Sequence, residues 1–226
     1  VPPGEGWVVC RPQPLEGHVA PHQYSPDLRR LLLRHLAAFR RRQLAPEGRR
    51  PAAVSLTVCR DGDHAALVVT RRSATLRAHS RQWALPGGRR DPGESAVGGA
   101  LRELHEEVGL RVGPDDVLGQ LDDYATRSGY VITPVVVWSD CAWQDLAPNP
   151  DEVELVRPFR FRELARRDSP VLQRIAESDG EVLSMNFHDD VIYAPTGAML
   201  YQFREVALFG RHTRVAHYEQ PLFAWR

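Results

Sequence analysis

Two runs of mainly apolar residues, the first of which alternates with polar positions, predict a hairpin in the first third of the chain. Residues 53–59 (AVSLTVC) and 65–70 (AALVVT) are rich in β-branched side chains, and Asp61-Gly62-Asp63 supplies a turn between them. Residues 118–124, 130–138 and 154–158 are further strand candidates. The second of these, YVITPVVVW, is long and β-branched, which favours a buried strand over a helix.

Apolar residues spaced three and four positions apart predict the helices. Ser25-Pro26-Asp27 starts one that runs from Leu28 to about Leu44, with its arginines on the outer face, and Ser95 caps another that stops at Gly109. Shorter helices are expected at 161–164, 170–178 and 198–204, and extended chain at 181–186, 206–209 and 214–225. The pattern predicts an α/β or α+β protein. We divide it into an N-terminal extension (1–50) with an Arg-rich amphipathic helix and one domain (51–226).

Composition narrows the classes of function. The 226 residues are 42% hydrophobic and carry 29 basic and 29 acidic side chains, so no net charge favours nucleic acid or a membrane as partner. All the basic residues are arginine, so any cationic contact with phosphate is a guanidinium. Three scattered cysteines fit a reducing compartment, and no apolar run approaches the roughly 20 residues of a membrane span. We therefore expect a cytoplasmic protein.

The segment from Gly88 to Leu110, GRRDPGESAVGGALRELHEEVGL, carries the candidate chemistry. Glu103, Glu106 and Glu107 follow the spacing i, i+3, i+4, which places three carboxylates on one helical face. Carboxylates held together repel one another, whereas Mg²⁺ prefers oxygen ligands and bridges carboxylates to phosphates. A solvated acidic face is the alternative for an arbitrary helix of this kind.

The complete spacing of this segment resembles the Nudix box, GX5EX7REUXEEXGU, at every fixed position. The resemblance implies the Nudix fold, a mixed curved β-sheet sandwiched between helices, and hydrolysis of a nucleotide derivative that depends on Mg²⁺ or Mn²⁺. It further implies that Glu103 and Glu107 are the principal metal ligands, assisted by Glu106 and the carbonyl of Gly88. Members of the family often form homodimers, so the N-terminal extension is expected either to pack on the domain or to complete a dimer.

Other acidic and basic residues take roles from the same resemblance. Arg102 is expected to anchor a carboxylate of the box, and Glu94 to hold the loop that precedes the helix. Nudix enzymes often recruit a further acid from a downstream loop, for which Glu152 is the first candidate and Glu154 the second. The proton of the attacking water has three candidate acceptors, which are Glu103, Glu106 and Glu152.

Residues upstream of the box suggest a substrate. Thr70-Arg71-Arg72-Ser73, Arg77 and Leu85-Pro86-Gly87-Gly88 resemble the motif LLTxRSxxxRxxxGxxxFPGG of the coenzyme A pyrophosphatase branch, although Arg81 occupies the glycine position and Leu85 replaces phenylalanine. The resemblance implies cleavage of coenzyme A or a derivative into 3′,5′-ADP and 4′-phosphopantetheine. Arg72 and Arg77 are then expected to bind the diphosphate or the 3′-phosphate.

Two alternatives stay open at this point. The same chemistry could serve ADP-ribose, a dinucleoside polyphosphate or an oxidised nucleoside triphosphate. A Nudix-like module could also bind nucleotides without hydrolysing them, but such modules typically lose box carboxylates, which this chain retains.

Overall fold

The computed structural model describes residues 22–73, 82–176 and 178–225. Within these ranges the helices are α1 (Pro26–Ala38), α2 (Ala96–Val108), α3 (Phe161–Leu164) and α4 (Thr196–Phe203). Short helical turns are η1 (Pro114–Asp116), η2 (Trp143–Asp145), η3 (Arg204–Leu208) and η4 (Leu222–Trp225). None of the helices in the described ranges is long and apolar enough to cross a membrane.

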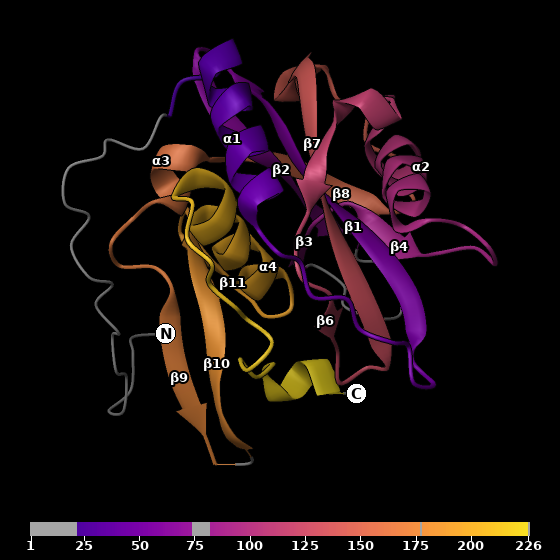
Figure 1. Ribbon diagram of the computed structural model, residues 1–226, viewed down its shortest axis with the longest axis vertical. Coiled ribbons are helices and arrows are strands. Elements are labelled where there is room, and N and C mark those ends of the chain that lie inside the picture. Colours follow the sequence, from indigo (N-terminus) through magenta and orange to yellow (C-terminus); the bar gives the residue numbers. More distant parts are fainter. Residues whose placement is uncertain (1–21, 74–81, 177, 226) are drawn as a thin grey trace.

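Two sheets organise the described chain (Figure 1). The eight-stranded sheet consists of β1 (Arg50–Asp61), β2 (His64–Arg72), β3 (Trp83–Ala84), β4 (Gly87–Arg89), β5 (Val117–Gln120), β6 (Tyr124–Ala125), β7 (Tyr130–Ala142) and β8 (Val153–Arg160). The smaller sheet consists of β9 (Val171–Ile175), β10 (Ser178–Phe187) and β11 (Asp190–Tyr193). The predicted hairpin is confirmed as β1 and β2, and the apolar run at 130–138 as β7.

The large sheet is mixed because β1 and β7 run parallel whereas the other pairs are antiparallel. On its other edge β1 changes partner: residues 58–61 pair with β2 and residues 52–54 pair with β4. Since β2 continues away from β1 to pair with β3 and β8, the sheet divides between β4 and β3. We call this division the fork, and Leu85-Pro86 crosses it from β3 to β4.

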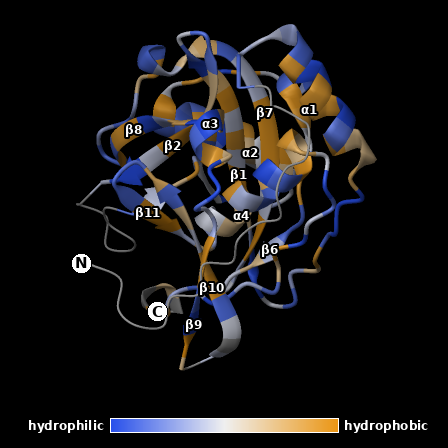
Figure 2. Ribbon diagram, turned by 90° about the vertical axis from the view of Figure 1, so that its left-hand side faces the viewer, coloured by the Kyte–Doolittle hydropathy of each residue, from blue (hydrophilic) through white to orange (hydrophobic). Residues whose placement is uncertain are grey.

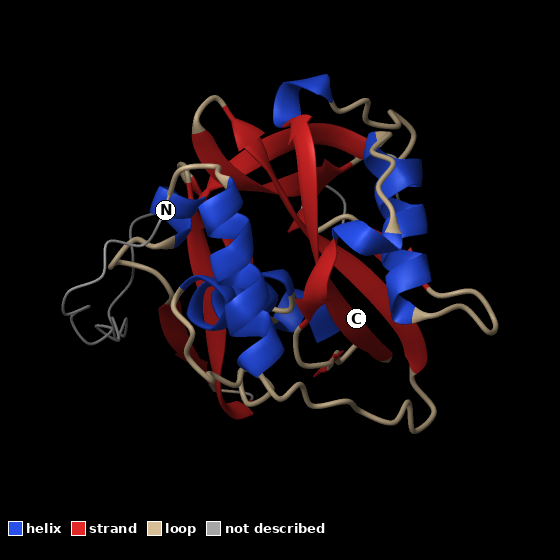
Figure 3. Cartoon of the chain, turned by 45° about the horizontal axis from the view of Figure 1, so that its top comes forward, coloured by secondary structure: helices blue, strands red, loops and turns tan. Residues whose placement is uncertain are grey.

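Helices cover both faces of the large sheet (Figure 3). On one face α2 packs through Ala100 against Ala53 of β1 and Val135 and Val137 of β7. On the other face α1 and α4 contribute to the largest apolar cluster, and Figure 2 shows apolar positions concentrated on the strands between these helices. The expected mixed sheet sandwiched between helices is therefore confirmed.

The first helix ends earlier than the sequence suggested. Ser25 caps α1 as predicted, but the helix stops at Ala38 rather than near Leu44, and Phe39 is already extended. Residues beyond it bind two buried aspartates: the Arg42 amide donates to Asp122 Oδ1 at 2.7 Å and the Leu44 amide donates to Asp123 Oδ2 at 2.9 Å. These distant acceptors outcompete continuation of the helix.

One of these aspartates, Asp122, also holds the C-terminal part of the chain, and the other binds a further residue of the N-terminal segment. Asp122 accepts hydrogen bonds from Arg214 Nη1 at 2.6 Å and from Gln202 Nε2 at 2.9 Å, while Asp123 binds Arg41 Nη2 at 2.6 Å. Asp122 and Asp123 with these partners form what we call the aspartate junction.

Three predictions for the C-terminal third are wrong. Residues 170–178 contain strand β9 instead of a helix, because Leu172 pairs with Leu183 across β10 and both become buried. Residues 206–209 were expected to be extended, yet η3 continues the turns of α4 through Leu208. Residues 214–225 hold turns, one bridge at Glu219 and the short η4 in place of a strand. The helix expected at 198–204 is confirmed within α4.

Candidate active site

A cavity of about 820 Å³ lies at the fork, between the large sheet and the segment that runs from β11 into α4. One wall comes from β4 and α2, and the opposite wall from residues 190–196. Its charged lining residues are Arg50, Arg72, Arg89, Glu103, Glu107, Glu152 and Asp190.

Local signals at both ends of α2 fix which residues face the cavity. The Ser95 hydroxyl accepts the Gly98 amide at 2.9 Å, and Gly109 closes the helix with a left-handed φ of 72°. Both predicted ends are confirmed. Within this frame Glu103 and Glu107 lie one turn apart and both line the cavity.

The glycine pair on β4 allows α2 to approach the cavity closely. A Cβ atom at Gly88 would lie 2.5 Å from Glu103 Oε1, and one at Gly87 would lie 2.4 Å from the carbonyl oxygen of Ala53. Either substitution would therefore displace a carboxylate or a strand. Helix α2 packs on the face of β1 that carries Ala53, whereas Ala52 and Val54 line the cavity from the other face. Because the glycines have no side chains, the carboxylates of α2 can pass β4 and reach the cavity.

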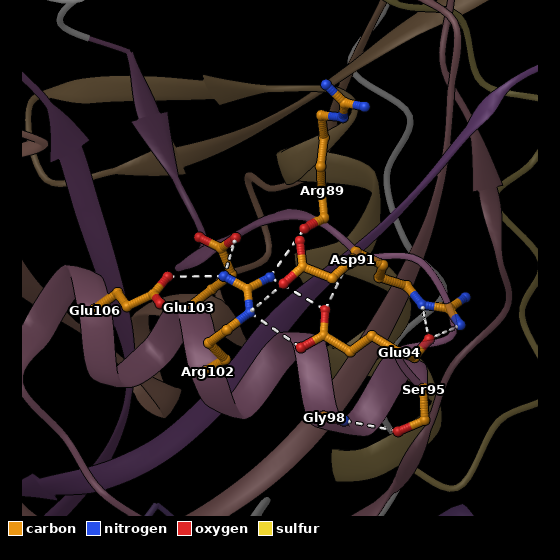
Figure 4. A network of polar contacts seen from close by, with 9 residues as sticks. Arg89, Asp91, Glu94, Ser95, Gly98, Arg102, Glu103 and Glu106 are labelled. Atoms are coloured by element: carbon orange, nitrogen blue, oxygen red, sulfur yellow. Dashed lines mark hydrogen bonds and ion pairs between the residues drawn. The ribbon is translucent and has the colours of Figure 1, made fainter.

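Arg102 organises the polar side chains beside the cavity (Figure 4). Its Nη1 donates to Glu103 Oε1 at 2.9 Å and to Glu106 Oε2 at 2.7 Å, while its Nε donates to Glu94 Oε1 at 3.0 Å. The other oxygen of Glu94 accepts the amide of Asp91 at 2.9 Å. Arg102 thus joins the loop before α2 to two carboxylates of the helix.

Burial changes the acidity of the two cavity carboxylates. Burial raises the pKa of Glu107 to about 8, and repulsion by Glu103 and Glu152 adds to the rise, while Arg72 and the Gly87 amide oppose it. Burial also raises the pKa of Glu103, against the opposing effect of Arg102. A cation at this site would remove the cost of ionising both groups.

A pH-dependent loss of stability should follow for the metal-free protein. The folded-state pKa of Glu107 is about 8 against an ordinary value of 4.5, so folding takes up a proton between these pH values and stability falls as the pH rises through that window. Each pKa unit corresponds to about 1.4 kcal/mol, and after allowance for relaxation we expect a loss of roughly 1–3 kcal/mol. Urea unfolding in a chelating buffer at pH 5 and pH 8 measures it.

Glu107→Gln supplies the comparison for that measurement, since the amide does not ionise. The difference in unfolding free energy between the two pH values should be smaller in this variant than in the wild type. An equal difference in both proteins would remove Glu107 as the source.

The other predicted acids lie in different places. Glu152 lines the same cavity as Glu103 and Glu107, whereas Glu154 pairs with Arg71 at 3.0 Å. The Glu106 side chain is 48% exposed, is held by Arg102 and is absent from the cavity lining. The structure therefore brings together three of the five acids proposed for metal binding or catalysis.

Oxygen donors at this site suit a hard divalent cation. Glu103, Glu107 and the backbone at Gly88 lie next to one another. Glu107 is only 4% exposed, and the like charges of Glu103 and Glu152 lie near it. Across the described ranges, no three Asp, Glu, His or Cys side chains form a group that would hold a metal ion unaided. A cation here would complete its shell with backbone, water and phosphate oxygens, which is how Mg²⁺ is commonly bound.

The two arginines predicted to bind substrate have different outcomes. Arg72 ends β2 and lines the cavity near Glu107, whereas Arg77 and the departure at Arg81 lie outside the described residues. The sequence analysis missed Arg50, Arg89 and Tyr130, which also line the cavity. If the predicted first strand is extended back to residue 50, its two-residue repeat places Arg50 on the same face as Ala52 and Val54.

Comparison with known proteins agrees with the presence of the box. Residues 48–183 match the NUDIX domain family, and the chain belongs to that family. It is 41% identical over 96 residues to a protein of Photorhabdus laumondii named "Uncharacterized Nudix hydrolase NudL", covering 42% of this chain and 50% of that protein. It is 34% identical over 104 residues to Nudix hydrolase 3 of Caenorhabditis elegans, covering 45% and 43% of the two chains.

A solved structure, a MutT/nudix family protein from Enterococcus faecalis, is similar at a TM-score of 0.44 and 18% identity over 65% of this chain and 51% of that one. The chain spans about half the length of the curated relatives it matches.

Proposed function

We propose that this protein is a divalent-metal-dependent pyrophosphohydrolase that cleaves coenzyme A or a derivative into 3′,5′-ADP and a 4′-phosphopantetheine species. The observation that carries the chemistry is the convergence of Glu103, Glu107 and Glu152 with Arg72 on one cavity, beside a glycine pair that lets Glu103 approach β4 closely. Such a site suits the attack of water on a diphosphate.

Each residue of the site has a role in this proposal. Glu103, Glu107 and the carbonyl of Gly88 hold Mg²⁺ or Mn²⁺, which when bound neutralises phosphate charge and acidifies water. Arg72 binds the diphosphate through its guanidinium. Arg102 is a positioning residue, because it fixes the orientation of Glu103 without lining the cavity.

Glu152 is the proton acceptor that the geometry favours. It lines the cavity from the loop before β8, and its charge interacts with those of Glu103 and Glu107, so it is free to accept a proton while those two carboxylates bind the metal. Glu106 fits the role less well because Arg102 holds it outside the cavity. General bases contribute typically 10²- to 10⁴-fold to a rate.

The variant Glu152→Gln should therefore lower kcat by about 100-fold or more, because the amide cannot accept the proton. The variant should still bind Mg²⁺ and the product 3′,5′-ADP with dissociation constants close to those of the wild type. Steady-state kinetics and calorimetry measure both. Glu154→Gln is the control, since Glu154 pairs with Arg71 outside the cavity. A fall in kcat of less than about fivefold in Glu152→Gln would assign the proton to another group.

The choice of coenzyme A is supported by the position of the upstream motif. Its residues Arg72, at the end of β2, and Leu85, in the segment that crosses the fork, both line the cavity, and Gly87-Gly88 adjoins the carboxylates. The described residues of the motif therefore lie at the site where the proposed chemistry takes place.

A product assay by mass-resolved chromatography tests the substrate. The protein is incubated with Mg²⁺ or Mn²⁺ and coenzyme A, acetyl coenzyme A, ADP-ribose or a dinucleoside polyphosphate. We expect 3′,5′-ADP from coenzyme A faster than AMP from the others. Faster AMP production would leave the Nudix chemistry in place and replace coenzyme A with the preferred alternative, whereas binding without turnover would favour a non-catalytic module.

A further inference from the structure

We propose that Arg50 and Arg89 form a second anion subsite, which binds a phosphomonoester that the substrate carries on its nucleoside, away from the diphosphate that is cleaved. The inference rests on the proposed function, because it assigns a part of the substrate to a part of the same cavity. It concerns residues outside both the box carboxylates and the upstream motif.

The first strand of the large sheet provides the floor of the cavity. Arg50, Ala52 and Val54 alternate along β1 and all line the cavity, as expected for one face of a strand. Tyr130 and Ile132 of the parallel neighbour β7 lie beside Arg50 and Ala52 in register and line the same floor. The floor is therefore apolar in its middle and basic at the end where Arg50 lies.

The guanidinium of Arg50 is oriented by its neighbours without being neutralised. Its Cζ atom lies 4.2 Å from the ring centroid of Tyr130, and its Nη2 donates to the carbonyl of Ser128 at 3.4 Å. Among the described residues Arg50 has no ion pair with an acid. Stacking on an aromatic ring leaves the edge of a guanidinium available for two parallel hydrogen bonds to a phosphate.

Arg89 adds a second cation on the same face of the sheet. It pairs with Ala52 in the β1–β4 register, so its side chain and that of Ala52 share the cavity face. Its carbonyl accepts Arg102 Nη2 at 3.0 Å, while its side chain points away from that network (Figure 4). Within the described chain its guanidinium, like that of Arg50, forms no ion pair with an acid.

The two charged ends of the cavity are separated along β1. Gly88, beside the carboxylates, pairs with Ala53, which is three residues from Arg50, a span of about 10 Å along a strand. The side chain of Arg50 is long, so its guanidinium can lie closer to the carboxylate end of the cavity than this backbone span. A substrate that fits has its diphosphate at Glu103 and Glu107, an uncharged sugar or ring over Ala52, and a second anion at the arginines.

The chemistry of the basic end selects a doubly charged group. Two guanidiniums without acidic partners carry net positive charge that a monoester dianion neutralises, whereas a hydroxyl at the same position leaves both unpaired. Such a dianion could be a phosphate on the ribose or the far end of a longer polyphosphate chain, and the test must separate these two sources.

Coenzyme A and dephospho-coenzyme A make a matched pair for the test, because they differ only in the 3′-phosphate on the ribose. The wild type should show kcat/KM at least about tenfold higher for coenzyme A than for dephospho-coenzyme A. In the double variant Arg50→Gln/Arg89→Gln this ratio should fall to about threefold or less. Arg49→Gln is the control, since Arg49 is adjacent in sequence but absent from the cavity lining, and it should keep the wild-type ratio.

A binding measurement separates this proposal from the proposed function. Calorimetry compares 3′,5′-ADP with AMP, and ADP with AMP, in wild type and double variant; it needs no turnover. A preference for 3′,5′-ADP over AMP that disappears in the double variant supports the subsite even if neither coenzyme is hydrolysed. A preference for ADP alone would identify a polyphosphate end as the anion and overturn the ribose source.

Two further results would overturn the subsite altogether. One is a wild type that has equal kcat/KM for coenzyme A and dephospho-coenzyme A and binds 3′,5′-ADP, ADP and AMP with equal affinity. The other is a double variant that keeps the wild-type ratio of kcat/KM and the wild-type binding preference.

Discussion

Glu107→Gln should lower kcat/KM for the diphosphate substrate by about 1000-fold or more, the largest effect that the site predicts. Glutamine has nearly the same shape, so the buried side chain still fits, but it lacks the negative charge that holds a divalent cation. The activity should recover little when Mn²⁺ replaces Mg²⁺. Turnover is measured across a wide range of metal concentrations, with metal binding followed by calorimetry.

The control for this variant is Glu154→Gln, which removes an acid from the Arg71 ion pair without touching the cavity lining. We expect it to retain activity within about threefold of wild type, as partly exposed ion pairs contribute little. A loss smaller than about tenfold in Glu107→Gln would contradict the assignment of Glu107 as a metal ligand.

Arg204→Ala should cause the largest loss of stability, about 3 kcal/mol or more in the free energy of unfolding. Arg204 is 2% exposed; its Nε donates to Glu205 Oε1 at 3.1 Å and its Nη1 donates to the carbonyl of Ser169 at 2.5 Å. Removal of the guanidinium leaves the buried Glu205 carboxylate with Arg211 as its one remaining charged partner among the described residues. Urea unfolding at pH 7 measures the loss.

The matched experiment replaces both members of the buried pair. Arg204→Met/Glu205→Leu removes the unpaired charge as well as the ion pair, so it should be less destabilising than Arg204→Ala. The interpretation fails if Arg204→Ala lowers the unfolding free energy by less than about 1 kcal/mol.

The part of the site that depends on local signals was predictable from the sequence. Ser95 and Gly109 delimit α2 through capping interactions that span only a few residues, and the spacing of Glu103 and Glu107 then fixes their common face. The strands β1, β2 and β7 were predictable for a similar reason, since long β-branched runs leave few alternatives.

Features that depend on distant partners were not predictable. The segment after α1 is extended because Asp122 and Asp123, some 80 residues away, bind its amides. Strand β9 and the continuation of α4 into η3 are likewise determined by pairing with β10 and by burial of Arg204. Local propensity carries no information about such contacts.

The floor of the cavity was also not predictable, because it depends on strands that are distant in the sequence. Arg50 lies at the first position of β1, where the strand signal is weakest, and its relation to Tyr130 exists only once β1 and β7 pair in parallel. The sequence could place Glu152 just before a strand, which is β8. It could not show that the start of β8 lies beside the carboxylates of α2, because this depends on the pairing of β8 with β2 in the folded sheet.

The aspartate junction bears on where this protein could be shortened. A fragment that began at residue 51 would lack Arg41 and the amides of Arg42 and Leu44, so Asp122 and Asp123 would remain buried without these donors. It would also lack the leucines of α1 that complete the apolar cluster on one face of the sheet. We propose that residues 22–50 belong to the same cooperative folding unit as the Nudix domain, so that recombinant fragments and domain grafts should begin before Ser25.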